Sequence, residues 1–231
     1  MQADPRLIVA LDLATRAEAE DMVEQLGDAV SFYKIGLQLL ATGGMAMAAD
    51  LKQRGRQVFL DWKLHDIGAT VEKAAAAIAA TESCDLITVH AEPQVMRAAV
   101  KGRGSANEMK ILGVTVLTSL SGQDLAEMGY GMGVSALVER RIRQALECGA
   151  DGVVASPHEA EIARKIGGPD FLVVTPGVRP AWAEANDQAR AASPSDALTN
   201  GASHLVVGRP ITAAGDPREA ALRIVGEMSG I

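Results

Sequence analysis

The chain has 231 residues, 48% of them hydrophobic, and carries a formal net charge of -7 at pH 7. This length is sufficient for one large hydrophobic core, and the acidic excess leaves no basic stripe of the kind that binds nucleic acid. The two cysteines, Cys84 and Cys148, have no metal-ligand or redox spacing, so we expect buried thiols in a reducing compartment.

Apolar, β-branched runs alternate along the chain with alanine- and glutamate-rich segments of helical spacing. The first run is too short, and too soon interrupted by Asp12, for a signal peptide or a membrane span, so we expect a cytoplasmic protein with no membrane partner. The runs predict eight strands, at residues 7–13, 31–37, 57–64, 86–91, 110–117, 152–156, 171–177 and 203–209. Helices are expected between them, for example at residues 16–26, 71–81, 136–148 and 217–228.

Eight strand–helix units in one chain predict an α/β protein with the (β/α)8 TIM-barrel fold. No Pro/Ser-rich linker separates two halves, so we interpret residues 1–231 as a single domain. The strands of such a barrel are parallel, and active sites of this fold lie at their carboxyl ends. The residues that end each predicted strand are therefore the candidates for function.

Ionisable side chains gather at those predicted strand ends. The third strand ends in Asp61-Trp62-Lys63-Leu64-His65-Asp66, and residues two apart in a strand project from the same face, so Asp61 and Lys63 point together. A salt bridge is the ordinary explanation of one such pair, but Asp12 ends the first strand and Lys34 lies in the second. Clustered buried charges are where pKa values shift, so we predict an active site here. The histidines are interpreted as structural: His65, His90, His158 and His204.

A phosphate site is predicted after the seventh and eighth strands, where barrels of this fold often bind phosphate. Arg179 follows the seventh strand, and Gly208-Arg209-Pro210 follows the eighth. Gly208 would let the backbone approach an anion closely, and Arg209 can donate charge-assisted hydrogen bonds to phosphate oxygens. Gln188, on the long connection between these strands, could fold over the same group. Taken in isolation, the Gly-Arg-Pro segment would be interpreted as a plain turn.

Taken together, these residues resemble the orotidine 5′-phosphate decarboxylase family, and the resemblance runs from Leu7 to Ile211. The D-x-K-x-x-D core is shared with a wider group of phosphate-binding decarboxylases and aldolases, whereas the Asp-Gln and Gly-Arg-Pro-Ile pieces are specific to the narrower family. One departure is Gly68-Ala69, where the family usually carries Pro-Asn, and it removes no catalytic group. The matching pieces are Val9-Ala10-Leu11-Asp12, Tyr33-Lys34-Ile35-Gly36, Asp61-Trp62-Lys63-Leu64-His65-Asp66-Ile67, Leu117-Thr118-Ser119, Thr175-Pro176-Gly177-Val178-Arg179, Asp187-Gln188 and Val207-Gly208-Arg209-Pro210.

The resemblance implies decarboxylation of orotidine 5′-monophosphate to UMP, the last step of UMP biosynthesis, with no cofactor and no metal. Lys63 would stabilise the negative charge that develops at C6 of the pyrimidine and would then donate the proton. Asp61 would lie beside the departing carboxylate and hold Lys63 charged and aimed. Lys34 would pair with the acids and contact the ribose, and Asp12 would take a ribose hydroxyl.

The resemblance also implies how the rest of the substrate is held. Thr118 and Ser119 would read the edge of the pyrimidine. The segment 179–190 would close over the phosphate. The residues implied to hold the phosphate are Arg179, Gln188, Gly208 and Arg209.

A homodimer is the last implication of the resemblance. Asp66 lies past the end of its strand, and a loop would have to double back to bring it beside Asp61. In the family, this aspartate and a following threonine, here Thr70, reach into the site of the neighbouring subunit. We therefore expect a two-fold symmetric dimer with two shared sites.

Two other functions remain open at this point. A Mg²⁺-dependent enzyme on the same scaffold, acting on a sugar phosphate through an enediolate, would be inhibited by a chelator. A catalytically inert barrel that binds a nucleotide phosphate would not need Lys63 or Asp61. A purely structural barrel would leave the clustered charges unexplained.

Overall fold

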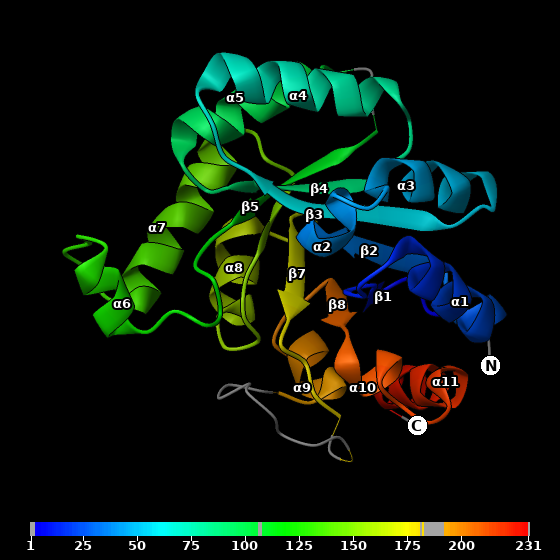
Figure 1. Cartoon of the computed structure of the whole chain (residues 1–231). Helices are drawn as coiled ribbons and strands as arrows, with labels where there is room; N and C mark the ends of the chain where they lie inside the picture. The colour runs from blue at the N-terminus through cyan, green and yellow to red at the C-terminus, as the bar shows by residue number, and fades with distance from the viewer. Residues whose placement is uncertain (1–2, 106–107, 181, 183–191, 231) are drawn as a thin grey trace.

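The protein, described by a computed structural model at residues 3–105, 108–180, 182 and 192–230, is a closed barrel of eight parallel strands (Figure 1). Each strand pairs with the next one along the chain, and β1 also pairs with β8, which closes the barrel. The predicted (β/α)8 fold is therefore confirmed. The strands are β1 (Leu7–Ala10), β2 (Phe32–Gly36), β3 (Gln57–Leu64), β4 (Leu86–His90), β5 (Lys110–Val114), β6 (Gly152–Val154), β7 (Leu172–Pro176) and β8 (His204–Val207).

Helices lie around the outside of the barrel (Figure 1). None in the described part of the chain is long and apolar enough to cross a membrane. Several begin at residues that sequence rules favour, such as Thr15, whose hydroxyl forms a capping box with Glu18. The helices are α1 (Arg16–Leu26), the 3-10 turn η1 (Gly27–Ala29), α2 (Leu37–Leu40), α3 (Gly44–Gln53), α4 (Gly68–Ala80), α5 (Pro93–Arg103), α6 (Gly122–Glu127), α7 (Val134–Glu147), α8 (Ala160–Gly167), α9 (Pro194–Thr199), α10 (Arg209–Thr212) and α11 (Pro217–Met228).

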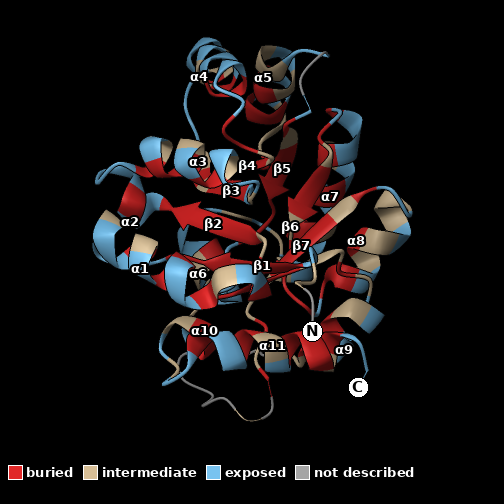
Figure 2. Cartoon of the chain, turned by 90° about the vertical axis from the view of Figure 1, so that its right-hand side faces the viewer, coloured by how far each residue is buried: buried red, intermediate tan, exposed pale blue. Residues whose placement is uncertain are grey.

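The helices α4 and α5 lie side by side, and their close packing depends on one glycine (Figures 1 and 2). A Cβ atom at Gly102 of α5 would lie 2.1 Å from the backbone oxygen of Glu72 in α4. No side chain fits in that space, because real Cβ atoms do not approach a backbone oxygen so closely. Any substitution there would push the two helices apart.

The core has two parts, one inside the barrel and one between the barrel and its helices. The strands are buried on both faces, as expected for parallel strands covered by helices (Figure 2). The outer part includes Leu7, Tyr33 and Ile35, whose side chains alternate with those that point inward. The inner part is formed by Ile8, Ala10, Phe32, Phe59, Leu86, Leu112, Val174 and Val206.

Several strands are shorter than the sequence predicts. Strand β1 ends at Ala10 rather than at residue 13, and β5 ends at Val114 rather than at residue 117. In both cases the apolar run continues past the last paired residue, so the hydrophobic pattern predicts a strand end later than the observed one. Strand β8 ends at Val207 because Gly208 already precedes the turn of α10. The shortened ends leave backbone and side chains free to line a cavity.

Candidate active site

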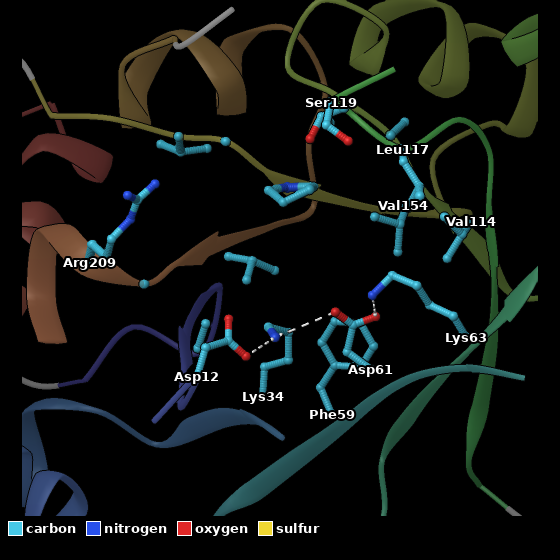
Figure 3. Close-up of a pocket in the computed structure, with 18 of the residues that line it drawn as sticks. Asp12, Lys34, Phe59, Asp61, Lys63, Val114, Leu117, Ser119, Val154 and Arg209 are labelled. Carbon is cyan, nitrogen blue, oxygen red and sulfur yellow. Dashed lines mark hydrogen bonds and ion pairs between the residues drawn. The ribbon is translucent and has the colours of Figure 1, made fainter. Parts of the chain in front are cut away.

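A cavity of about 460 Å³ opens at the carboxyl ends of the strands. Its floor is formed by the last inward-pointing residues of the strands, and its rim is formed by the segments that follow β5, β7 and β8. Figure 3 shows charged side chains on one side of this cavity and apolar side chains close beside them. A cavity of a size that suits a small ligand therefore lies at the strand ends, where the sequence predicts the site.

Four charged side chains form an alternating row along the cavity floor (Figure 3). Nζ of Lys34 lies 2.9 Å from Oδ1 of Asp12 and 3.5 Å from Oδ2 of Asp61. Oδ1 of Asp61 accepts a hydrogen bond of 2.9 Å from Nζ of Lys63. Each acid therefore has a base beside it, which is the condition under which charges tolerate burial.

The row becomes more exposed toward its two ends. The side chains of Lys34 and Asp61 are only 7% and 15% exposed, whereas those of Lys63 and Asp12 are 26% and 54% exposed. Burial alone would raise the pKa of the Asp61 carboxyl. The ammonium groups of Lys34 and Lys63, together with side-chain hydrogen bonds, outweigh burial and lower the pKa of Asp61 below its usual value. The carboxylate is therefore ionised at neutral pH.

Gly36, at the end of β2, makes room for the row. A Cβ atom at this position would lie 2.5 Å from Oδ1 of Asp12 and 3.1 Å from Nζ of Lys34. A side chain here would collide with the same two atoms that form the first ion pair of the row. Gly36 belongs to the motif Tyr33-Lys34-Ile35-Gly36, and its closeness to Asp12 and Lys34 gives it this physical role.

An apolar surface faces the Lys63 end of the row. Val114, Val116 and Val154 line this part of the cavity, and Figure 3 shows two of them, Val114 and Val154, next to the Lys63 side chain. Such a surface keeps water away and strengthens electrostatic interactions with any charge that forms there. These residues were not predicted as site residues, although β-strand alternation places Val114 and Val154 on the inner face of their strands.

Arg209 lies across the cavity from Lys63 (Figure 3). It is the first residue of α10, and Gly208 and Thr212 line the same region. Arg179 approaches from the segment after β7, so two arginines line this part of the cavity. Thr175, by contrast, is fully buried in β7 and does not line the cavity.

The comparisons with known proteins agree with one another. The sequence model of the "Orotidine 5'-phosphate decarboxylase / HUMPS family" matches residues 5–224. The chain belongs to this family. Among its relatives, an "Orotidine 5'-phosphate decarboxylase" of Caulobacter sp. (strain K31) is 68% identical over 231 residues, covering 100% of both chains.

More distant relatives carry the same name. That of Methylobacterium radiotolerans is 54% identical over 229 residues and covers 98% of each chain. The crystal structure of orotidine 5'-phosphate decarboxylase from Lactobacillus acidophilus superposes with a TM-score of 0.85 at 36% identity, over 97% of this chain and 99% of that one. The resemblance drawn from the motifs is therefore confirmed.

Most of the residues that the family resemblance singles out line one cavity in this member of the orotidine 5'-phosphate decarboxylase / HUMPS family. Thr118 and Ser119 lie on its rim, in the segment between β5 and α6. Gln188 falls outside the described residues. The predicted site residues that line the cavity are Asp12, Lys34, Asp61, Lys63, Thr118, Ser119, Arg179, Gly208 and Arg209.

Asp66 and Thr70 are not brought into this cavity. Both are exposed, and neither lines the hollow. Asp66 lies between β3 and α4, where its carboxylate accepts a hydrogen bond of 2.6 Å from the backbone N–H of Ile67. Its position fits the expectation that this residue does not double back toward Asp61 of the same chain.

The histidines lie outside the cavity lining. The rings of His65 and His90 are 4.9 Å apart, and Nε2 of His65 lies 3.3 Å from a carboxylate oxygen of Glu92. Burial lowers the pKa of His90, so this ring is neutral at neutral pH. His204 packs edge-on against Phe32 inside the barrel, with a centroid distance of 5.9 Å.

Proposed function

We propose that the protein decarboxylates orotidine 5′-monophosphate to UMP, the final step of de novo UMP biosynthesis. The observation that carries this proposal is the alternating row of Asp12, Lys34, Asp61 and Lys63 along one cavity floor. Membership of the family and the names of the relatives support the same activity. We propose further that residues 1–231 act as a single domain in the cytoplasm and that the reaction uses no cofactor and no metal.

The difficult step is breakage of the bond between C6 and the carboxylate carbon. The electron pair stays on C6, which has no adjacent carbonyl group to accept it, while CO2 leaves. A fixed ammonium group next to C6 lowers the energy of this charge, and Lys63 supplies that group beside the apolar surface of Val114 and Val154. Nζ of Lys63 then gives its proton to C6 and is later reprotonated from water.

The other members of the row prepare Lys63 and hold the sugar. The ionised carboxylate of Asp61 pairs with the ammonium group of Lys63 and fixes its direction through the 2.9 Å hydrogen bond. Lys34 neutralises both acids and lies where the ribose passes, and the more exposed Asp12 accepts a ribose hydroxyl.

The phosphate and the pyrimidine are held at the rim. Arg209 and Arg179 provide charge-assisted hydrogen bonds to phosphate oxygens, with Gly208 allowing backbone approach and Gln188 covering the group. Since this site lies across the cavity from Lys63, the phosphate gives binding energy that positions the distant reacting carbon. Thr118 and Ser119 bind the edge of the base.

We propose a two-fold symmetric homodimer in which Asp66 and Thr70 complete the partner's site. Both are exposed and outside the cavity of their own chain. The apolar side chains of Leu37, Leu40 and Ile67 are 56%, 42% and 70% exposed at the ends of β2 and β3, so this edge offers a surface for a second copy. Light scattering at assay concentration should give twice the chain mass, and a fully active monomer would contradict the shared site.

The first test is an absorbance assay of the purified protein with orotidine 5′-monophosphate in excess EDTA. Loss of substrate with formation of UMP is expected, at the same rate with and without the chelator. Turnover only on a sugar phosphate in the presence of Mg²⁺ would instead assign the protein to the metal-dependent reaction. Binding of UMP without any turnover would identify an inert nucleotide-binding barrel.

A further inference from the structure

Strand β3 changes its register against β4 where the charged row passes through it. Phe59 and Leu60 pair with Leu86 and Ile87, but the next pair joins Leu64 to Val89. Three residues of β3, Asp61 to Lys63, therefore face a single residue of β4, which is Thr88. The local bulge removes the regular ladder from the segment that carries two residues of the proposed catalytic row.

The bulge forces an unfavourable backbone conformation on Lys63. Its φ angle is +49°, in the left-handed region that residues other than glycine rarely adopt. Such a residue costs about 1–3 kcal/mol and persists only where its surroundings hold it in place. Something in the barrel must therefore hold Lys63 in this conformation.

The hydroxyl of Thr88 is the group that does so. It accepts a hydrogen bond of 3.0 Å from the backbone N–H of Lys63, in place of the lost ladder contact. It also donates its proton to Oδ1 of Asp61 at 2.9 Å. Since an N–H can only donate and an ionised carboxylate can only accept, the single hydroxyl proton is committed to Asp61.

Thr88 lies behind the row and not in the cavity. Its side chain is fully buried, and it is not among the residues that line the hollow. The oxygen of Asp61 that it contacts is the same oxygen that binds Nζ of Lys63. One hydroxyl thus fixes both ends of the Asp61–Lys63 pair: the backbone of the lysine and the carboxylate that aims its ammonium group.

We propose that Thr88 is a positioning residue for decarboxylation, which directs the Lys63 ammonium group toward the reacting carbon by holding the bulge and the Asp61 carboxylate together. This inference rests on the proposed function. It assigns Thr88 no contact with the substrate, so its loss should slow the chemical step without weakening binding.

The test compares Thr88→Val with Thr88→Ser in the full-length protein. Valine keeps the shape of threonine but can make neither hydrogen bond, whereas serine keeps the hydroxyl and loses only a methyl group. We expect Thr88→Val to lower kcat about 10- to 100-fold with KM within about threefold of wild type, and Thr88→Ser to stay within about fivefold in kcat. The affinity for UMP, measured by calorimetry, should be unchanged in both variants.

Thr175→Val is the matched control. Thr175 is equally buried in a strand of the same barrel, and its hydroxyl has no hydrogen-bond partner among the described residues. Its kcat should stay within about twofold of wild type, which separates loss of this particular hydroxyl from loss of any buried one. If Thr88→Val does not fold, Thr88→Cys takes its place, since a thiol is a poor donor and acceptor, and the same fall in kcat is expected.

Several results would overturn the inference. One is a kcat for Thr88→Val within threefold of wild type. Another is a fall in kcat for Thr88→Ser as large as that for Thr88→Val. A third is a loss of activity that comes from a higher KM or a weaker affinity for UMP, with kcat unchanged. In each of these cases an active wild-type protein leaves the proposed function intact. A wild-type protein that does not turn over orotidine 5′-monophosphate would overturn both.

Discussion

Two successive layers inside the barrel are built on the same strands but consist of opposite kinds of side chain. The lower layer contains Ile8, Phe32 and Phe59, all fully buried and apolar. Two residues further along β2 and β3, the inward positions are Lys34 and Asp61. One step of the strand period thus separates a layer that stabilises the fold from a layer that carries charge.

The comparison shows that the site is the last layer of the barrel interior, in which charged side chains replace apolar ones, and not a separate pocket within the apolar core. The apolar layer lies one strand period before the charged row, so Lys34 and Asp61 follow the fully buried Phe32 and Phe59. The charges of the row balance one another through ion pairs, and the packed apolar layer holds the row in place. Substitutions in the two layers should therefore have separable effects on chemistry and on stability.

The largest effect is expected for Lys63→Ala in the charged layer. This change removes the ammonium group that we propose stabilises the charge at C6 and donates the proton, so kcat/KM should fall by at least about 10⁴-fold. The thermal unfolding temperature should change little, because Lys63 is not part of the apolar layer. Activity within a hundredfold of wild type in a steady-state assay would refute its role.

Arg209→Ala should have the next largest effect on activity. Loss of the proposed phosphate contact should lower kcat/KM by roughly 10²- to 10⁴-fold, which corresponds to about 3–5 kcal/mol of transition-state binding. Arg143, an exposed arginine of α7 paired with Glu139, is a suitable control, and Arg143→Ala should be indistinguishable from wild type. A loss below tenfold in Arg209→Ala would mean that Arg209 is not the phosphate anchor.

Phe32→Ala tests the apolar layer. The side chain is fully buried inside the barrel, does not line the cavity and contacts the ring of His204. The free energy of unfolding in urea should fall by about 3–5 kcal/mol, because the change leaves a void that the closed barrel cannot fill. The fraction that stays folded should keep a kcat near that of wild type; a large loss of kcat in folded protein would show that the layers are not separable.

The smallest effect is a pH dependence of stability that comes from Asp61. Its pKa is lowered in the folded protein, so the ionised carboxylate contributes stability above the unfolded value of about 4, and this contribution is lost as the pH falls toward the folded pKa. Urea titrations of wild type and Asp61→Asn should show the difference between them shrinking only below about pH 4. A constant difference across that range would mean that Asp61 has an ordinary pKa.

The sequence was sufficient to predict the barrel and the charged row. Hydrophobic period and strand-end position are local properties, and they are sufficient to predict that Asp12, Lys34, Asp61 and Lys63 lie together. The exact strand ends were less accurate, because the apolar run after β5 continues past the last paired residue.

Other parts of the site depend on contacts between distant segments. The role of Thr88 follows from a register shift between β3 and β4, and no local pattern reports how one strand is aligned against another. The sequence alone indicates that Val114 and Val154 are ordinary core residues, and the structure places them beside Lys63. Asp66 and Thr70 do not line the cavity of their own chain, so their proposed function depends on a second chain.

Closure of the barrel by β1 and β8 has a consequence for when the protein first becomes active. Asp12 follows the first strand and Arg209 follows the last, and the two line the same cavity. A ribosome must therefore release nearly the whole chain before Asp12 and Arg209 can come together in that cavity. Turnover during synthesis or refolding therefore cannot begin before the last strand joins the first and the ring is completed.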